Sequence, residues 1–199
     1  FGKDITYALD ENMNVDYKKI IYFLKKHSSK NFLIFGFTSI IWNFFINQVS
    51  LKKINYDFYN ATLLHGGGWK KLSGININND SFKRILKKKF GINKIHNYYG
   101  MIEQTGSIFI ECEKGYLHTS NFSDIIIRDN QFHKLDFRKK GIVQLISCLP
   151  LSYPGHNIIT EDEGEIIGED DCKCGRMGKY FVIHGRIPDS ELRGCSDTY

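Results

Sequence analysis

The sequence predicts an α/β protein, with a parallel sheet and covering helices in the first half and a mostly β second half. In the first half, segments with helical spacing of apolar residues alternate with short apolar runs, which is the pattern of a parallel sheet. After about residue 107 the helical periodicity disappears, and short apolar segments separated by turns replace it. The 199 residues, 42% hydrophobic and 25% charged, suffice for one sizeable core and exclude a disordered, collagen-like or coiled-coil chain.

The first helix is expected from about Asp16, because Tyr17, Ile20, Ile21 and Leu24 follow it at helical spacing. No charged residue appears from Phe32 to Leu51, a stretch long enough to span a membrane. Gly36, Thr38 and Ser39 divide this stretch, so we expect a short strand (32–35) and then an amphipathic helix capped by Thr38 or Ser39, rather than a membrane span. The apolar stripe of that helix comprises Ile40, Ile41, Phe44, Phe45 and Val49.

Two further strands, ATLL (61–64) and KIHNYY (94–99), flank a helix that begins near Asp80 and stops at Gly91. The apolar face of this helix leaves Lys87, Lys88 and Lys89 on the opposite, solvated side. The second half then contains five predicted strands, SIFIEC (107–112), FSDIIIRD (122–129), GIVQLISCL (141–149), GEII (164–167) and KYFVIHG (179–185).

The charge balance is mildly basic, with 27 Lys and Arg against 22 Asp and Glu, or +5. This charge is too small for a surface that coats nucleic acid, so we expect no nucleic-acid partner. The chain has no signal peptide and opens on Phe1 in mid-pattern, so we expect a fragment of a longer cytoplasmic protein.

Three glycines in a row follow the strand at 61–64, in HGGGW (65–69). They let the backbone approach a flat or charged ligand, because glycine has no Cβ. The alternative is that they form a plain turn. Neither of the two common phosphate-binding patterns, GxGxxG and GxxxxGK(S/T), is present. In NYYGMIEQTG (97–106), Tyr98 or Tyr99 could stack on a base and Glu103 could hold Mg²⁺. The alternative here is a tyrosine-rich strand edge with a solvated glutamate.

Two more residues suit a nucleotide. Asp162 is expected in a loop before a strand, where a carboxylate can accept hydrogen bonds from ribose hydroxyls. Arg186 follows a glycine at a strand end and offers a fork of donors to the same ligand. His156, in a predicted turn, faces either a site or solvent.

The order of these motifs resembles that of adenylate-forming enzymes. Within that superfamily, residues 61–199 resemble the acyl-protein synthetases, typified by the fatty-acid-activating component of the bacterial luminescence fatty-acid reductase. The segments that carry the resemblance are HGGGWKKL, NYYGMIEQTGSIFIEC, SYPGHNIITEDEGEI, CKCGRMGK and RGCSDTY.

The resemblance implies a role for each matching residue. Residues 1–184 would be the C-terminal portion of the large domain, and residues 185–199 a hinge motif with Asp189 and a tail. Glu103 would coordinate Mg²⁺. The residues implied in nucleotide binding are Gly66, Gly67 and Gly68 at the adenine, Tyr99 and Gly100 near the base, and Asp162 and Arg186 at the ribose.

The sequence departs from the superfamily pattern in two places. Ile102 stands where a threonine usually reaches the α-phosphate, so Thr105 or a residue outside this sequence would have to make that contact. The Ser/Thr/Gly-rich phosphate loop that precedes these motifs in the family is not in this sequence.

The cysteines divide into two chemistries. Cys112, His118, Cys172 and Cys174 supply three sulfurs and one imidazole, the number that a closed tetrahedral Zn²⁺ site needs, and the related phenylacetate-CoA ligases look similar here. The alternative is that the cysteines are reduced and packed as small apolar groups. Cys148, in an apolar strand, is expected in the core.

Cys195 lies near Arg193, whose charge would favour a thiolate, and it matches the place of the acylated cysteine in acyl-protein synthetases. The resemblance therefore implies that ATP and Mg²⁺ activate a fatty acid as acyl-AMP, that Cys195 receives the acyl group as a thioester, and that a partner protein accepts it. The alternatives are a ligase with coenzyme A as acceptor and a non-catalytic, zinc-stabilised paralogue that binds a nucleotide or a partner.

Overall fold

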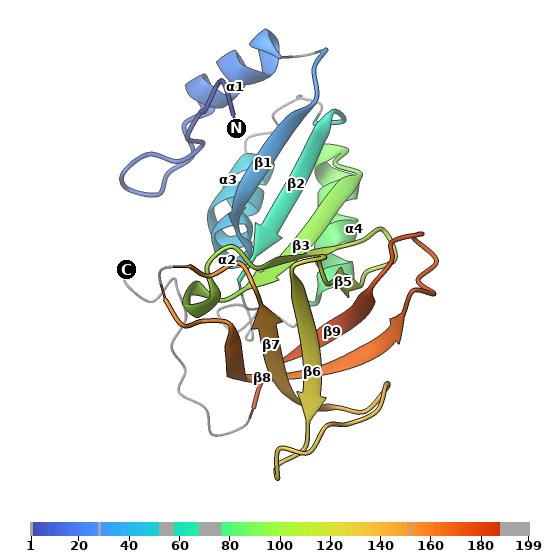
Figure 1. Cartoon of the computed structure of the whole chain (residues 1–199). Helices are drawn as coiled ribbons and strands as arrows, with labels where there is room; N and C mark the ends of the chain where they lie inside the picture. The colour runs from blue at the N-terminus through green and yellow to red at the C-terminus, as the bar shows by residue number, and fades with distance from the viewer. Residues whose placement is uncertain (1, 28, 52–57, 68–76, 152, 188–199) are drawn as a thin grey trace. The chain divides into compact units, whose positions relative to one another are not determined.

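The computed structural model describes residues 2–27, 29–51, 58–67, 77–151 and 153–187. The chain divides into two compact units, Phe1–Ile95 and His96–Tyr199. We describe each unit by itself (Figure 1).

The first unit contains a parallel strand pair with helices packed against it, as predicted. Strands β1 and β2 run parallel, with Phe32 opposite Ala61 and Phe37 opposite Gly66. Helices α3 and α4 lie on the same side of this pair (Figure 1), because one face of the strands joins the core that includes Leu63 and Phe82. The elements are α1 (Tyr17–Lys26), β1 (Phe32–Phe37), α2 (Thr38–Ile40), the π-helix η1 (Ile41–Ile46), α3 (Asn47–Leu51), β2 (Ala61–Gly66) and α4 (Asn79–Phe90).

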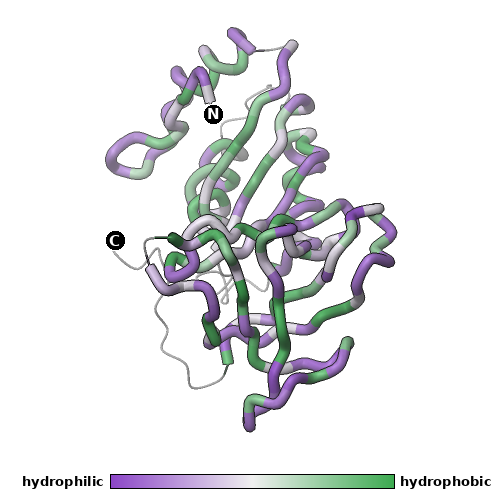
Figure 2. Tube along the Cα trace, in the orientation of Figure 1, coloured by the Kyte–Doolittle hydropathy of each residue, from purple (hydrophilic) through white to green (hydrophobic). Residues whose placement is uncertain are grey.

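Strand β1 is apolar on both faces (Figure 2). Phe32, Ile34 and Gly36 are half-buried, whereas Leu33 and Phe35 are exposed at 59% and 65%. The burial alternates with every residue, as it must in a strand that packs on one side.

The capping residues explain where two helices begin and end. The carboxylate of Asp16 accepts a hydrogen bond from the backbone N–H of Lys19 (3.0 Å), which confirms the predicted start of α1. Helix α4 begins slightly earlier than predicted, because its N-cap is Asn78, whose side chain accepts from the N–H of Ser81. Gly91 ends α4 in the left-handed conformation (φ 72°), as predicted.

The prediction that Thr38 or Ser39 caps the second helix is wrong. The N-cap is Phe37, and no side chain caps this end. The buried hydroxyl of Thr38 instead donates to the carbonyl of Gly66 (3.0 Å) and lies 2.9 Å from Nδ1 of His65, so it ties the start of α2 to the end of β2. The apolar stripe is confirmed in part: Ile41, Phe45 and Val49 are buried, whereas Ile40 and Phe44 are half-buried. Trp42 and Ile46, which the stripe did not include, are buried as well. Among the described residues, no helix has the length and hydropathy that a membrane crossing requires.

The second unit is mostly β, as predicted, and its strand pairs are antiparallel. Strand β3 crosses the boundary between the units, and the pairing then runs β3–β4, β4–β5, β5–β9, β9–β8, β8–β7 and β7–β6. The elements are β3 (Lys94–Gly100), the 3-10 helix η3 (Ile102–Gln104), β4 (Ile108–Glu111), β5 (Leu117–His118), β6 (Ser123–Arg128), β7 (Gly141–Ser147), β8 (Asn157–Glu169) and β9 (Lys179–Arg186).

The β8–β9 pair has irregular register. Glu163 lies opposite Gly185 and Gly164 opposite Ile183, so β9 contains one extra residue between them. Asp162 lies opposite Arg186. The prediction that Asp162 occupies a loop is therefore wrong: β8 begins seven positions before the predicted GEII strand, since Asn157 is its first residue.

The second unit has a main apolar core and a second, smaller buried cluster of Cys112, Cys172 and Tyr180. The prediction that Cys148 belongs to the core is wrong, because β7 ends at Ser147 and Cys148 is exposed. The three lysines of α4 in the first unit are exposed, as predicted, and so is His156 of the second unit. The core residues of the second unit are Phe109, Leu117, Ile125, Ile127, Val143, Leu145, Ile166 and Phe181.

Candidate functional site

Three of the predicted nucleotide residues gather in the second unit. Tyr99 of β3 and Asp162 of β8 meet in a hydrogen bond, in which the phenol donates to the carboxylate Oδ2 over 2.7 Å. Arg186, the last residue of β9, lies directly opposite Asp162 in the sheet and is half-buried. These three residues therefore lie close together in this unit, and their roles at a nucleotide stay predictions.

The hydrogen bond has a clear electrostatic consequence. Burial raises the pKa of Tyr99 far above its ordinary value, and the negative charge of Asp162 raises the pKa further. Tyr99 is therefore a neutral donor at any physiological pH. Nη1 of Arg186 lies 3.3 Å from the carboxylate of Glu161, the residue before Asp162 in β8, so this arginine forms an ion pair with a second acidic side chain.

Glu103 lies exposed on η3, and its backbone is closely supported. Gln104, the next residue, is fully buried, and its Nε2 donates to the carbonyls of Gly155 (2.8 Å) and Leu145 (3.4 Å). The backbone of Gly155 approaches the carbonyl of Glu103 so closely that no Cβ would fit between them. The sequence did not mark Gln104, because a three-residue helix offers no periodicity that identifies a buried residue. It did not mark Gly155 either, because its partner is 51 residues away and no local pattern indicates that contact.

Ile102 and Thr105 both lie close to Glu103 in the sequence. No contact within the described residues shows either of them taking the place of the threonine that usually reaches the α-phosphate in this superfamily. Thr105 is exposed, and its hydroxyl donates to the carbonyl of Ile102 (3.3 Å), while the side chain of Ile102 is 75% exposed. Gly100 ends β3, and a Cβ there would lie 3.0 Å from the carbonyl oxygen of Ser107. The roles of Thr105 and Gly100 at a nucleotide stay predictions.

The glycines of HGGGW belong to the first unit. Gly66 is buried at the end of β2, and Gly67 is exposed with a φ of 86°, a conformation that favours glycine. Gly68, Asp189 and Cys195 lie outside the described residues, so their roles also stay predictions.

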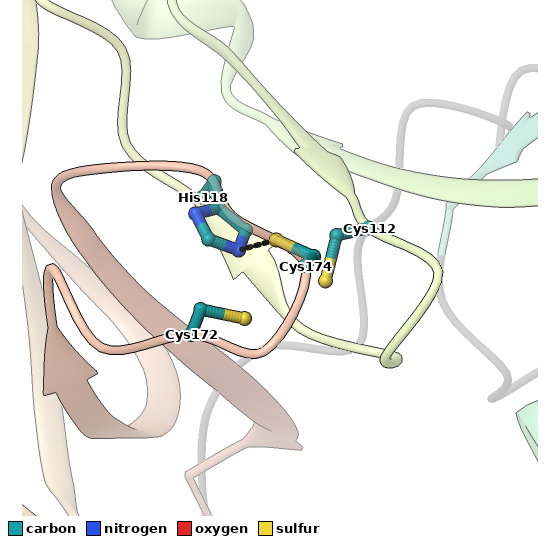
Figure 3. A group of neighbouring side chains, drawn as sticks. All are labelled: Cys112, His118, Cys172 and Cys174. Atoms are coloured by element: carbon teal, nitrogen blue, oxygen red, sulfur yellow. Dashed lines mark hydrogen bonds between the residues drawn. The ribbon is translucent and has the colours of Figure 1, made fainter.

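Four potential metal ligands converge elsewhere in the second unit. Cys112 follows β4, His118 lies in β5, and Cys172 and Cys174 lie in the turn between β8 and β9 (Figure 3). Their ligand atoms all lie within 4.8 Å of one another. Nε2 of His118 is 3.4 Å from Sγ of Cys174. A tetrahedral zinc with bonds of about 2.0–2.3 Å needs ligand atoms roughly 3.5–4 Å apart, so the donor set and its spacing fit this ion.

The surroundings of the cluster also suit a metal. The backbone N–H groups of Lys114 and Arg176 each point at a sulfur, Cys112 and Cys174 respectively, over 3.4 Å. Such donors stabilise thiolate ligands. Burial, together with the nearby charge of Arg176, lowers the pKa of His118, so its ring is neutral and can act as a ligand.

Several solved structures share this fold. The luciferase-like enzyme from the nonluminescent Zophobas morio mealworm is 16% identical with a TM-score of 0.55, over 87% of this chain and 41% of its own. A 2-hydroxyisobutyryl-CoA ligase, solved in an open conformation with 2-HIB-AMP and CoA, is 15% identical with a TM-score of 0.63, over 85% of this chain and 39% of its own. ATP-bound MatB from Rhodopseudomonas palustris is 14% identical with a TM-score of 0.54, over 83% and 33%.

At these identities the likeness establishes the fold alone: the chain has the fold of part of each of these enzymes. The chain spans between 33% and 41% of the length of these three structures. No curated protein matches the chain. The model of the family described as "Acyl-protein synthetase, LuxE" matches residues 3–199, so the chain belongs to the acyl-protein synthetase family.

Proposed function

We propose that the complete protein uses ATP to activate a fatty acid and then carries the acyl group on Cys195. The observation that carries this proposal is the hydrogen bond from Tyr99 to Asp162, together with the pairing of Asp162 with Arg186 across β8 and β9. A half-buried carboxylate there can accept hydrogen bonds from the two hydroxyls of a ribose. Family membership and the fold support the same chemistry.

The first step joins the fatty acid to AMP. A carboxylate oxygen of the acid attacks the α-phosphorus of ATP, the bond from that phosphorus to the bridging oxygen breaks, and pyrophosphate leaves. Asp162 and Arg186 hold the nucleoside, and Glu103, an exposed carboxylate on a closely supported backbone, holds Mg²⁺. When bound, Mg²⁺ neutralises negative charge on the phosphates.

The second step moves the acyl group to the protein. The Cys195 thiol loses its proton to solvent, and the thiolate sulfur attacks the acyl carbon. The bond from that carbon to the phosphate oxygen breaks, AMP leaves, and a thioester remains. A partner protein then accepts the acyl group from Cys195.

The test uses the complete protein with radiolabelled fatty acid, ATP and Mg²⁺. We expect a protein-bound label that hydroxylamine removes, and we expect Cys195→Ser to abolish it while acyl-AMP still forms. Cys148→Ser is the matched control, because Cys148 is exposed and lies outside the proposed site. CoA-dependent turnover that Cys195→Ser leaves intact would favour a CoA ligase instead. Failure to exchange pyrophosphate into ATP with any carboxylic acid would favour a non-catalytic protein.

We also propose that Cys112, His118, Cys172 and Cys174 hold a structural Zn²⁺. The proposal is supported by their three sulfurs and one imidazole, all within 4.8 Å, and by their burial, since three of the four are buried. Such an ion would fasten the β4–β5 pair to the turn between β8 and β9. Purified protein should contain one zinc per chain, and Cys172→Ser should lose it. Protein that folds fully without bound metal would contradict the proposal.

A further inference from the structure

We propose that Tyr99 is a positioning residue, whose hydroxyl holds the carboxylate of Asp162 in the orientation that receives the ribose hydroxyls. This inference rests on the proposed function, because it assumes that Asp162 binds a nucleotide. It differs from the role that motif resemblance implies for Tyr99, which is stacking on the base. It predicts that the phenol oxygen, and not the ring alone, contributes to the recognition of ribose.

The position of the Tyr99 ring is set by the core. Tyr99 lies opposite Phe109 in the β3–β4 pair, and the two ring centroids are 6.2 Å apart. Phe109 is itself fully buried and packs edge-on against Phe181, with centroids 5.3 Å apart. A ring packed against this core aromatic residue presents its hydroxyl at a fixed point, and that point is 2.7 Å from Oδ2 of Asp162.

The backbone of Asp162 is fixed as well. Its N–H donates to the hydroxyl of Thr160 (3.1 Å), and this buried hydroxyl donates in turn to the carbonyl of Val143 (2.9 Å). Once the backbone is fixed, the carboxylate can still rotate about its side-chain torsions. The bond from Tyr99 to Oδ2 restrains that rotation and leaves Oδ1 to face a ligand.

A neutral phenol suits this task better than a cation would. A hydrogen bond from a neutral donor to a carboxylate is strong and directional, but it leaves the negative charge in place. The neighbouring cation, Arg186, lies 3.3 Å from Glu161 and is therefore drawn partly toward another carboxylate. Asp162 thus keeps the negative charge that attracts the two ribose hydroxyls, while Tyr99 sets the orientation of its carboxylate.

The test measures nucleotide binding by the complete protein, with ATP and 2′,3′-dideoxy-ATP as paired probes. We expect wild-type protein to prefer ATP. Tyr99→Phe should reduce this preference about tenfold, the usual effect of losing one hydrogen bond to a charged group, while the affinity for dideoxy-ATP stays the same. In an Asp162→Asn background, Tyr99→Phe should have no further effect on the preference, because the two residues act together.

The controls separate positioning from stacking and from general stability. Phenylalanine retains the ring, so a stacking role alone predicts no change with either nucleotide, and that result would overturn the inference. An equal loss of affinity for both nucleotides would overturn it too, since a general structural defect weakens binding whether or not the ribose hydroxyls are present. Tyr98→Phe, in the adjacent position, should leave the preference unchanged. Wild-type protein that binds neither nucleotide would refute the proposed function itself. Wild-type binding without any ribose preference would refute the role of Asp162 while leaving acid activation open to the thioester assay.

Discussion

Gly155→Ala should displace the loop that carries Glu103. The φ angle of Gly155 is not in the left-handed region, so alanine suits the backbone and the change tests steric contact alone. An added Cβ would lie far inside the 3.0 Å that real Cβ atoms keep, against the carbonyl oxygen of Glu103, and 3.3 Å from its carbonyl carbon. Both partners are backbone atoms, so no flexible side chain can move aside.

The cost follows from what must move. Overpacking of this kind typically costs about 1–3 kcal/mol, and the shift falls on η3 and on the hydrogen bond from Gln104 to Gly155. We expect the free energy of unfolding to fall by about 2 kcal/mol, measured by urea denaturation. We also expect the rate of acyl-AMP formation to fall at least tenfold, because Glu103 would move away from the Mg²⁺ that we propose it holds.

The matched control is Gly2→Ala, where the nearest side-chain atom would lie at an ordinary 3.6 Å. It should change neither stability nor rate. The reasoning would be refuted by a Gly155→Ala protein with wild-type stability and wild-type acyl-AMP formation. A stability loss without a rate loss would retain the steric argument and remove the link from Gly155 to Glu103.

Three other predictions concern stability. Phe109→Ala should lower the free energy of unfolding by about 3–5 kcal/mol in urea denaturation, because this fully buried ring contacts two other aromatic rings; a loss below about 1 kcal/mol would contradict its central place in the core. Removal of metal by a strong chelator should lower the melting temperature by at least about 5 °C, whereas Cys172→Ser protein should not respond to the chelator. The N–H of Lys19 holds the pKa of Asp16 below its ordinary value of 3.8, so the stabilisation is present above that pH and is lost as the pH falls through the lowered pKa. Asp16→Asn keeps the cap but does not titrate, so its acid unfolding measured by circular dichroism should lack this component.

Helix ends could be predicted where a side chain or glycine acts locally. Asp16 and Gly91 function as their residue types suggest, since an N-cap and a left-handed C-cap depend on a few neighbouring atoms. The prediction for Thr38 was wrong because its hydroxyl can form a hydrogen bond either at the local helix end or with a distant group. In the structure it donates to the carbonyl of Gly66, 28 residues away. Only the tertiary structure decides between them.

The strands, too, could be predicted only where the local sequence pattern determines them. Apolar runs predicted five strands of the second half. They did not predict β5, which is only two residues long, or the acidic part of β8, where Asp162 and Glu163 pair with β9. Local pattern carries no information about such pairing. The four metal-ligand candidates were predicted by chemistry and number, and they converge, because donor count constrains a site in a way that hydrophobic pattern does not.

The extra residue in β9 has a consequence for which way Arg186 points. Phe181 faces the core, and five positions separate it from Arg186, so unbroken alternation would send the arginine to the opposite side of the sheet. The bulge near His184 and Gly185 resets the count and turns Arg186 to the side of its partner, Asp162. The orientation of Arg186 therefore depends on the number of residues between it and Phe181, more than on which residues they are. Deletion of His184 should disturb this hairpin more than most substitutions in it.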